Sequence, residues 1–378
     1  MPTKSCPILF FFQILALFLI TVNVTRFREK LLIFLTIFYT TIAIFTLIIA
    51  LVYKEMIFDV RTTLGAILDI IQLAIPVATQ ILTLIESVRK RETLRKIWEK
   101  IIKISNLLHE IPQNPNELFN EIYKKFFWKF FTFNGGATFI EMLILIRLRE
   151  DYPWLRHRSA AFLPSLISRS LIFLYILHVD ILGGVSREIS EILRRISNEN
   201  RIYPSDRRCV KICWKIVNEL WLCEQFLRKT FALSILGIIT SYCILLTVDF
   251  YWNFKAFFRA STNNVLESSL CSIPFILTLI PLVFSGETCK EQRKKIFVKI
   301  FSIQPKCASM ATFGKFLRNF TLSGLHGSFE LKAWEFMSID LRLLSEMVQT
   351  IGIYLTIFIQ FEITYYGKYG SGYVYVPQ

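Results

Sequence analysis

The sequence predicts an all-α fold, a polytopic membrane protein with seven transmembrane helices. Of its 378 residues, 53% are hydrophobic and only 19% are charged, which leaves too few polar side chains to cover soluble cores of that size. The 44 Lys and Arg, against 29 Asp and Glu, gather between uncharged apolar runs. Basic loops beside apolar runs are typical of membrane insertion, so the net charge of +15 does not indicate a nucleic-acid partner.

Seven apolar runs are long enough to cross about 30 Å of hydrocarbon as helices. They cover residues 31–53, 64–88, 130–146, 160–184, 230–252, 265–285 and 343–366. An eighth apolar stretch, residues 7–25, has three open interpretations: a signal peptide, a further span, or an interfacial segment packed against the helix bundle. We favour the last, because only five residues, three of them basic, separate this stretch from residue 31.

The distribution of basic residues predicts the orientation. Of the 44 Lys and Arg, 34 lie on the side of the amino terminus, in residues 1–30, 89–129, 185–229 and 287–342, and 9 lie on the other side, with Arg169 inside a span. Basic residues near span ends stay in the cytosol. We therefore expect a cytosolic amino-terminal segment, residues 1–30, and an extracellular tail, residues 367–378.

The three long cytosolic segments are expected to be helical. In residues 89–129 the apolar residues recur at spacings of three and four, with charged residues between them, and residues 185–229 show the same pattern. The apolar residues of the first segment are Leu94, Ile97, Ile101, Ile104 and Leu108. Together with residues 287–342, these helices are expected to form a cytosolic domain below the membrane helices of residues 31–88, 130–184, 230–286 and 343–366.

The sequence predicts no enzyme, no cofactor and no metal site. It contains no Walker A loop, no G-x-S-x-G and no H-E-x-x-H motif. Cys209 and Cys213 have a C-x3-C spacing, but no second pair accompanies them, and the chain has only four His.

Charged and polar side chains inside the second to sixth spans predict an outward-facing ligand pocket. A charge in hydrocarbon must face a cavity or a partner. The intramembrane charges include Asp69, Glu141, Arg169 and Asp249. The first three lie toward the outer halves of their spans, where they form either structural ion pairs or the polar floor of a pocket. Pockets for small molecules combine apolar walls with a few polar groups. The candidate ligand-binding residues are Asp69, Gln72, Phe139, Glu141, Ser165, Arg169, Tyr242, Ser272 and Phe275.

The last span carries a polar stripe on an otherwise apolar helix. At 100° per residue its polar and small residues fall within an arc of about 80°; they are Ser345, Gln349, Gly352, Thr356 and Gln360. Such a stripe must meet polar neighbours or water. It is either a seam buried inside one bundle or, with symmetric copies of the chain around an axis, the wall of a channel.

The end of this span resembles the carboxyl-terminal signature of insect gustatory receptors. Tyr354, the five apolar residues 355–359, Gln360 and Phe361 match the family's T-Y-x5-Q-F, with Ile353 in place of Thr. The resemblance implies a tetrameric, ligand-gated, nonselective cation channel in the plasma membrane of sensory neurons, with a cytosolic anchor domain and a small-molecule tastant as ligand. It places Gln360 and Phe361 at the constriction of a pore lined also by Ser345, Gln349 and Thr356, in copies of this chain or of related receptor chains.

Three alternatives remain. The first is an odorant receptor of the same superfamily. The second is a G-protein-coupled receptor, although its amino terminus would be outside and the chain has no N-P-x-x-Y in the last span. The third is a transporter, although the spans show no internal repeat.

Overall fold

The chain is described here from a computed structural model that covers residues 7–15, 17, 26–52, 63–111, 115–148, 156–199, 203–258, 262–303, 311–326, 331–333 and 337–369. These residues are helical except for short connections and one small hairpin, in which β1 (Lys332–Ala333) pairs antiparallel with β2 (Met337–Ser338). The helices are α1 (Pro7–Ile14), α2 (Arg26–Val52), α4 (Thr63–Arg89), α5 (Arg91–His109), α6 (Pro115–Phe130), η1 (Phe131–Gly135), α7 (Gly136–Leu148), α8 (Arg156–Asn198), α9 (Pro204–Phe258), α10 (Thr262–Ile303), α11 (Ala311–His326) and α12 (Leu341–Tyr369). The all-α prediction is therefore confirmed for the described residues.

Six of the described helices are long and apolar enough to cross a membrane. They are α4, the continuous helix of α6, η1 and α7, and the helices α8, α9, α10 and α12. The first predicted span falls on α2, where the described residues contain a shorter apolar helix, Ile33–Ile49. The seventh span thus stays a prediction.

The amino-terminal helix α1 has only eight residues, a length of about 12 Å that is too short to span a bilayer. Phe12 is fully buried, and its ring lies edge-to-face with that of Phe130 at the end of α6, at a centroid distance of 5.7 Å. Residues 18–25 lie outside the described residues, so the three interpretations of residues 7–25 stay open.

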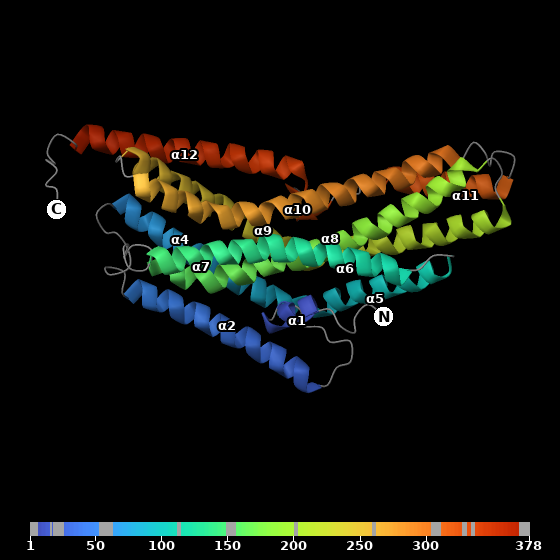
Figure 1. Ribbon diagram of the computed structural model, residues 1–378, viewed down its shortest axis with the longest axis horizontal. Coiled ribbons are helices and arrows are strands. Elements are labelled where there is room, and N and C mark those ends of the chain that lie inside the picture. The colour runs from blue at the N-terminus through green and yellow to red at the C-terminus, as the bar shows by residue number, and fades with distance from the viewer. Residues whose placement is uncertain are drawn as a thin grey trace.

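The helices α8, α9 and α10 run on to one end of the molecule, where α5 and α11 also lie (Figure 1). They have 43, 55 and 42 residues, about two to three times the length that hydrocarbon requires. Their continuations lie beside α5, α6 and α11 at one end of the molecule, and one apolar core runs from the spans into this end. Residues 185–229, which were expected to be helical, are mainly the end of α8 and the start of α9.

The amphipathic pattern of α5 decides how that helix packs. All five apolar residues that the periodicity identified are at most 4% exposed, and α5 packs along α9. Its charged residues remain outside, where Lys100 and Lys103 reach Glu219 of α9 with N–O distances of 2.7 and 2.6 Å. Burial of one apolar stripe therefore attaches α5 to the bundle.

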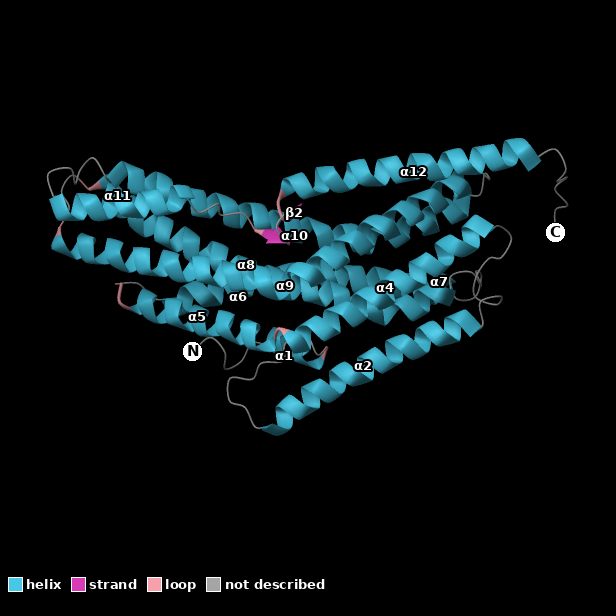
Figure 2. Cartoon of the chain, turned by 180° about the vertical axis from the view of Figure 1, so that it is seen from behind, coloured by secondary structure: helices cyan, strands magenta, loops and turns pink. Residues whose placement is uncertain are grey.

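The last helix lies at the edge of the chain (Figure 2). Among the described residues it packs mainly on α9, with a smaller contact to α10. Only 17% of its most apolar window is buried, against 67% for α8 and 61% for α9. Most of the surface of α12 is therefore left uncovered by the described part of the chain.

The start of α12 is held against α10 by a close backbone approach. A Cβ added at Gly286 of α10 would lie 2.0 Å from the carbonyl oxygen of Ile339, so that only glycine fits there. Ile339 also donates its backbone N–H to the carbonyl of Leu331 at 2.7 Å, which ties this joint to the hairpin.

A carboxylate caps the same end of α12. Asp340 accepts the backbone N–H of Arg342 at 3.1 Å and the ammonium of Lys290 on α10 at 2.7 Å. Burial raises the pKa of Asp340, but hydrogen bonds from Lys290 and Ser338 lower it by more, so the pKa lies below its usual value. The cap and its tether are therefore charged at neutral pH.

Candidate functional site

A small cavity lies between five of the spanning helices, α4, α7, α8, α9 and α10. Its volume is about 60 Å³, and its apolar walls include Ile144, Leu145, Phe162, Leu245 and Phe275. A water-sized group needs about 10–15 Å³ of such space, so the cavity has room for a few non-hydrogen atoms. Apolar walls with a few polar groups are typical of sites for small molecules.

The polar side chains that line the cavity are Gln72, Glu141, Ser165 and Asp249. Gln72 of α4 donates its side-chain amide to a carboxylate oxygen of Asp249 on α9, at 2.9 Å. Both side chains are almost fully buried, at 5% and 1% exposure. This hydrogen bond joins two walls of the cavity and orients the carboxylate of Asp249.

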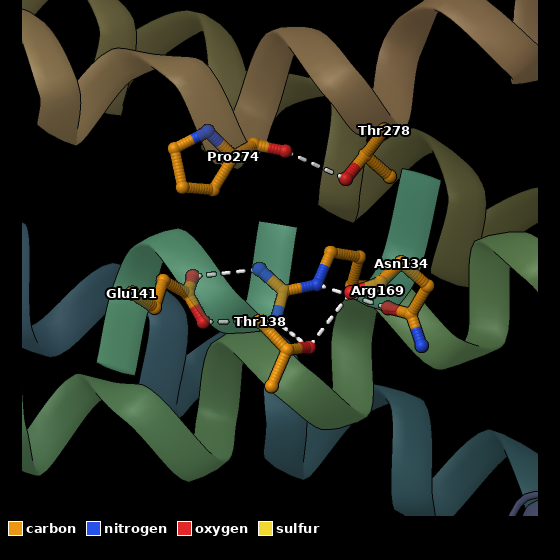
Figure 3. A network of polar contacts seen from close by, with 6 residues as sticks. All are labelled: Asn134, Thr138, Glu141, Arg169, Pro274 and Thr278. Atoms are coloured by element: carbon orange, nitrogen blue, oxygen red, sulfur yellow. Dashed lines mark hydrogen bonds and ion pairs between the residues drawn. The ribbon is translucent and has the colours of Figure 1, made fainter. Parts of the chain in front are cut away.

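Glu141 forms a buried ion pair with Arg169 of α8 (Figure 3). The two terminal nitrogens of the guanidinium donate to the two carboxylate oxygens at 2.6 and 2.8 Å. The remaining donors reach the side chains of Asn134, at 3.1 Å, and Thr138, at 3.2 Å. Asn134, Thr138 and Glu141 follow one another at spacings of four and three, so they share the face of η1 and α7 that meets α8.

Glu141 belongs both to an ion pair and to the lining of the cavity. Its carboxylate lines the cavity and also neutralises Arg169, which is only 2% exposed. The π-helical turn η1 contains Asn134 and interrupts the helix beside this pair. Such turns are frequent at functional sites.

Four of the predicted ligand-binding residues line the cavity. They are Gln72, Glu141, Ser165 and Phe275. Two others lie directly behind them: Arg169 contacts Glu141, and the ring of Tyr242 lies 5.0 Å from that of Phe275.

Three predicted residues lie outside the cavity lining. Asp69 and Ser272 are buried, at 1% and 3% exposure, but neither lines the cavity. Phe139 is 63% exposed on the outer surface of α7. It is two residues, about 200° on a helical wheel, from Glu141 and therefore points the opposite way.

Asp249 was expected as an intramembrane charge and not as a pocket residue, yet it lines the cavity. Its signal was a lone carboxylate in the apolar run 230–252. The apolar lining residues Pro76, Ala161, Leu245 and Cys271 carried no such signal, because apolar residues of these types are common on every span.

The polar stripe of the last helix is exposed. Ser345, Gln349, Gly352, Thr356 and Gln360 all lie on the surface of α12 that the described chain leaves uncovered. A seam buried within one bundle is therefore not observed for these five residues. Phe361, beside the stripe, is 64% exposed.

Polar contacts between α9 and α12 hold the last helix on its packed side. The Tyr251 hydroxyl donates to a carboxylate oxygen of Glu362 at 2.7 Å, and the ammonium of Lys255 lies 3.3 Å from the other oxygen. The same ammonium lies 5.1 Å from the centre of the Trp252 ring. Tyr251 is two residues from Asp249, so α9 presents the cavity carboxylate and the α12 contact on opposite faces.

Long apolar helices around a small cavity, with one polar-striped helix left uncovered by the described residues, define a polytopic membrane protein. The sequence profile of the 7tm Chemosensory receptor family matches residues 5–365. The chain belongs to this family, the superfamily of insect odorant and gustatory receptors, whose members are receptors and not enzymes. No curated protein matches it in sequence.

Solved structures support the same fold. The chain is similar to the insect olfactory receptor OR5 from Machilis hrabei, with a TM-score of 0.58 and 11% identity. It is also similar to that receptor in complex with eugenol, with a TM-score of 0.66 and 13% identity. In both comparisons the match covers 94% of this chain and 97% of the other. At such identity the likeness concerns the fold alone.

Proposed function

We propose that this protein is a gustatory chemoreceptor that works as a ligand-gated, nonselective cation channel, with four copies of the chain or of related receptor chains around one pore. The observation that carries the proposal is the exposed polar stripe of α12. One stripe is too narrow to enclose a path for water and ions, whereas symmetric copies facing a common axis enclose one. The match to the gustatory signature at Gln360 and Phe361 supports the same assignment.

The pore is lined in this proposal by Ser345, Gln349, Thr356, Gln360 and Phe361. Hydroxyl and amide oxygens offer acceptors that replace part of a cation's hydration shell without binding the ion too tightly to leave. A ring of Gln360 amides beside Phe361 forms the constriction. Discrimination among monovalent cations requires coordinating oxygens held in a fixed geometry; the Gln360 amides are on flexible side chains, so this selectivity is expected to be weak.

A small-molecule tastant opens the channel from the cavity between α4, α7, α8, α9 and α10. Helix α9 is the connection to the pore, because Asp249 faces the cavity while Tyr251 and Lys255 hold Glu362 of α12. A ligand that displaces α9 therefore changes the support of the pore helix. Arg169 and Tyr242 contribute from behind the lining, through their contacts with Glu141 and Phe275.

In this proposal the protein lies in the plasma membrane of sensory neurons. Its chain has seven spans and a cytosolic amino terminus. The ends of α8, α9 and α10, with α5, α6 and α11, form the cytosolic anchor domain. The excess of Lys and Arg on these segments supports that orientation.

Substitution of Gln360 tests the pore. Gln360→Glu would add a ring of carboxylates, so conductance and block by divalent cations should change while the ligand concentration for half-maximal current shifts little. Gln360→Ala should widen the constriction and give a leak without ligand. The control is Phe358, about 160° away on the wheel, whose ring contacts Tyr251 on α9 at 6.0 Å. Phe358→Ala should lower expression or stability more than permeation. Unaltered conductance, selectivity and block in both Gln360 variants, at normal surface expression, would exclude this pore.

An odorant receptor is the second candidate, favoured by the similarity to the olfactory receptor OR5 and by the eugenol in one of its structures. A panel of soluble tastants and volatile odorants, applied to cells that express this chain, separates the two. Currents only with volatile compounds would replace the gustatory assignment and leave the channel assignment in place.

A further inference from the structure

The cavity is acidic. Two of its lining residues, Glu141 and Asp249, are carboxylates, and the described residues that line it include no Lys or Arg. The nearby cation, Arg169, directs its guanidinium to Glu141, Asn134 and Thr138 in the wall. The positive charge therefore lies behind one carboxylate, and the cavity itself presents carboxylate oxygens.

This charge arrangement favours a positively charged ligand. Charges interact more strongly in an apolar interior than in water, so a second anion in a cavity with carboxylate walls is strongly disfavoured. A cation with N–H donors is favoured because it supplies both charge and hydrogen bonds to acceptors that have no hydrogens of their own. The bond from Gln72 holds the Asp249 carboxylate in one orientation before a ligand arrives.

The volume and apolar walls of the cavity limit the size and polarity of the uncharged part of the ligand. The volume of about 60 Å³ fits a short chain better than an aromatic ring system, and the walls at Phe162, Leu245 and Phe275 offer contacts to aliphatic carbons. A polyol would leave most of its hydroxyl groups against apolar walls without partners. The complementary molecule is thus small, branched or linear, and polar at one end only.

We propose that the cavity binds short-chain primary amines in their protonated form, with the ammonium at the Asp249 carboxylate and the aliphatic carbons against Phe162, Leu245 and Phe275. Glu141 contributes a second acceptor while it remains paired with Arg169. Gln72 is a positioning residue that orients Asp249. The proposal rests on the assignment of this cavity as the ligand site of the channel and specifies the chemical class of the ligand.

The test compares three molecules with the same carbon skeleton: 3-methylbutylamine, 3-methylbutanol and 3-methylbutanoate. An alkylamine has a pKa near that of Lys, about 10.4, so the amine is protonated at neutral pH. Binding to the purified full-length protein in nanodiscs is measured by calorimetry, and currents are recorded from cells that express it. We expect the amine to bind at least about tenfold more tightly than the alcohol, a difference of about 1.4 kcal/mol, and the carboxylate not to bind.

A conservative substitution tests whether the ammonium binds at Asp249. Asp249→Asn should weaken amine binding at least about tenfold and change alcohol binding less than about twofold, because only the charge interaction is lost. The alcohol is thus an internal control for folding of the variant. Equal binding of amine and alcohol by the unmodified protein, or equal loss of both in the variant, would overturn the proposal.

The two measurements separate this proposal from the channel itself. Amine binding without current in the unmodified protein would leave the ligand class in place and remove the channel assignment. Currents opened by the alcohol or the carboxylate but not by the amine would leave the channel in place and remove the ligand class.

Discussion

Breaking the buried pair of Glu141 and Arg169 should destabilise the protein in an asymmetric way. Glu141→Gln leaves the guanidinium, only 2% exposed, without its counter-charge and removes one of the two bonds at 2.6 and 2.8 Å. Removal of one partner of a buried pair typically costs about 3–5 kcal/mol. The bonds from Arg169 to Asn134 and Thr138 remain, so we expect a loss of about 3 kcal/mol.

The opposite substitution should be milder. Arg169→Met leaves a carboxylate that faces the cavity, where its side chain is 14% exposed. We expect a loss of about 1–3 kcal/mol, the range for an unmet buried hydrogen bond. The double variant carries neither charge and should lose about as much as Arg169→Met alone. The sum of the losses in the two single variants is therefore expected to exceed the loss in the double variant by about 3 kcal/mol.

Unfolding of the detergent-solubilised protein by increasing fractions of SDS measures these free energies. The matched control is the exposed pair of Glu191 and Arg194, which lie at 43% and 52% side-chain exposure with an N–O distance of 2.7 Å. Glu191→Gln should cost less than about 1 kcal/mol, because water screens such pairs. Losses at Glu141 and Arg169 that add within about 0.5 kcal/mol in the double variant would refute the reasoning.

Three further outcomes are expected. Gly286→Ala should lower the free energy of unfolding in SDS by about 1–3 kcal/mol, because its Cβ would overlap the Ile339 carbonyl. The control is Gly136→Ala, whose added Cβ has nothing within 4 Å and which should be neutral or stabilising by up to about 1 kcal/mol. Equal effects of the two substitutions would contradict the close approach of α10 to Ile339. Tyr251→Phe removes the hydrogen bond to the Glu362 carboxylate. It should lower the free energy of unfolding by about 1.5–3 kcal/mol and shift the ligand dose–response. If neither the free energy nor the dose–response changes, this contact does not support α12. A glycosylation acceptor added after Gln378 should be modified in microsomes, whereas an unmodified acceptor there, with glycosylation of the long helical segments instead, would reverse the proposed orientation.

The sequence alone determined the elements that depend on local pattern. Apolar runs predicted the spanning helices, and the spacing of Leu94 to Leu108 predicted the buried face of α5, because a helix repeats every 3.6 residues whatever it packs against. The polar stripe from Ser345 to Gln360 was likewise visible, since it lies on one helix. The sequence also carries the family membership, through the signature at residues 354–361 and the profile match over residues 5–365.

Only the tertiary structure decided what the intramembrane polar groups meet. The sequence could not tell that Arg169 of α8 reaches Glu141 of α7, or that Gln72 of α4 holds Asp249 of α9, 177 residues away. Such pairs depend on the rotation and height of separate helices in the bundle, which apolar runs do not encode because many packings bury them equally well. For the same reason Phe139 was expected in the pocket and lies on the outer face of α7 instead. The cavity is a property of five helices together, and no single segment of the chain carries enough information to specify it.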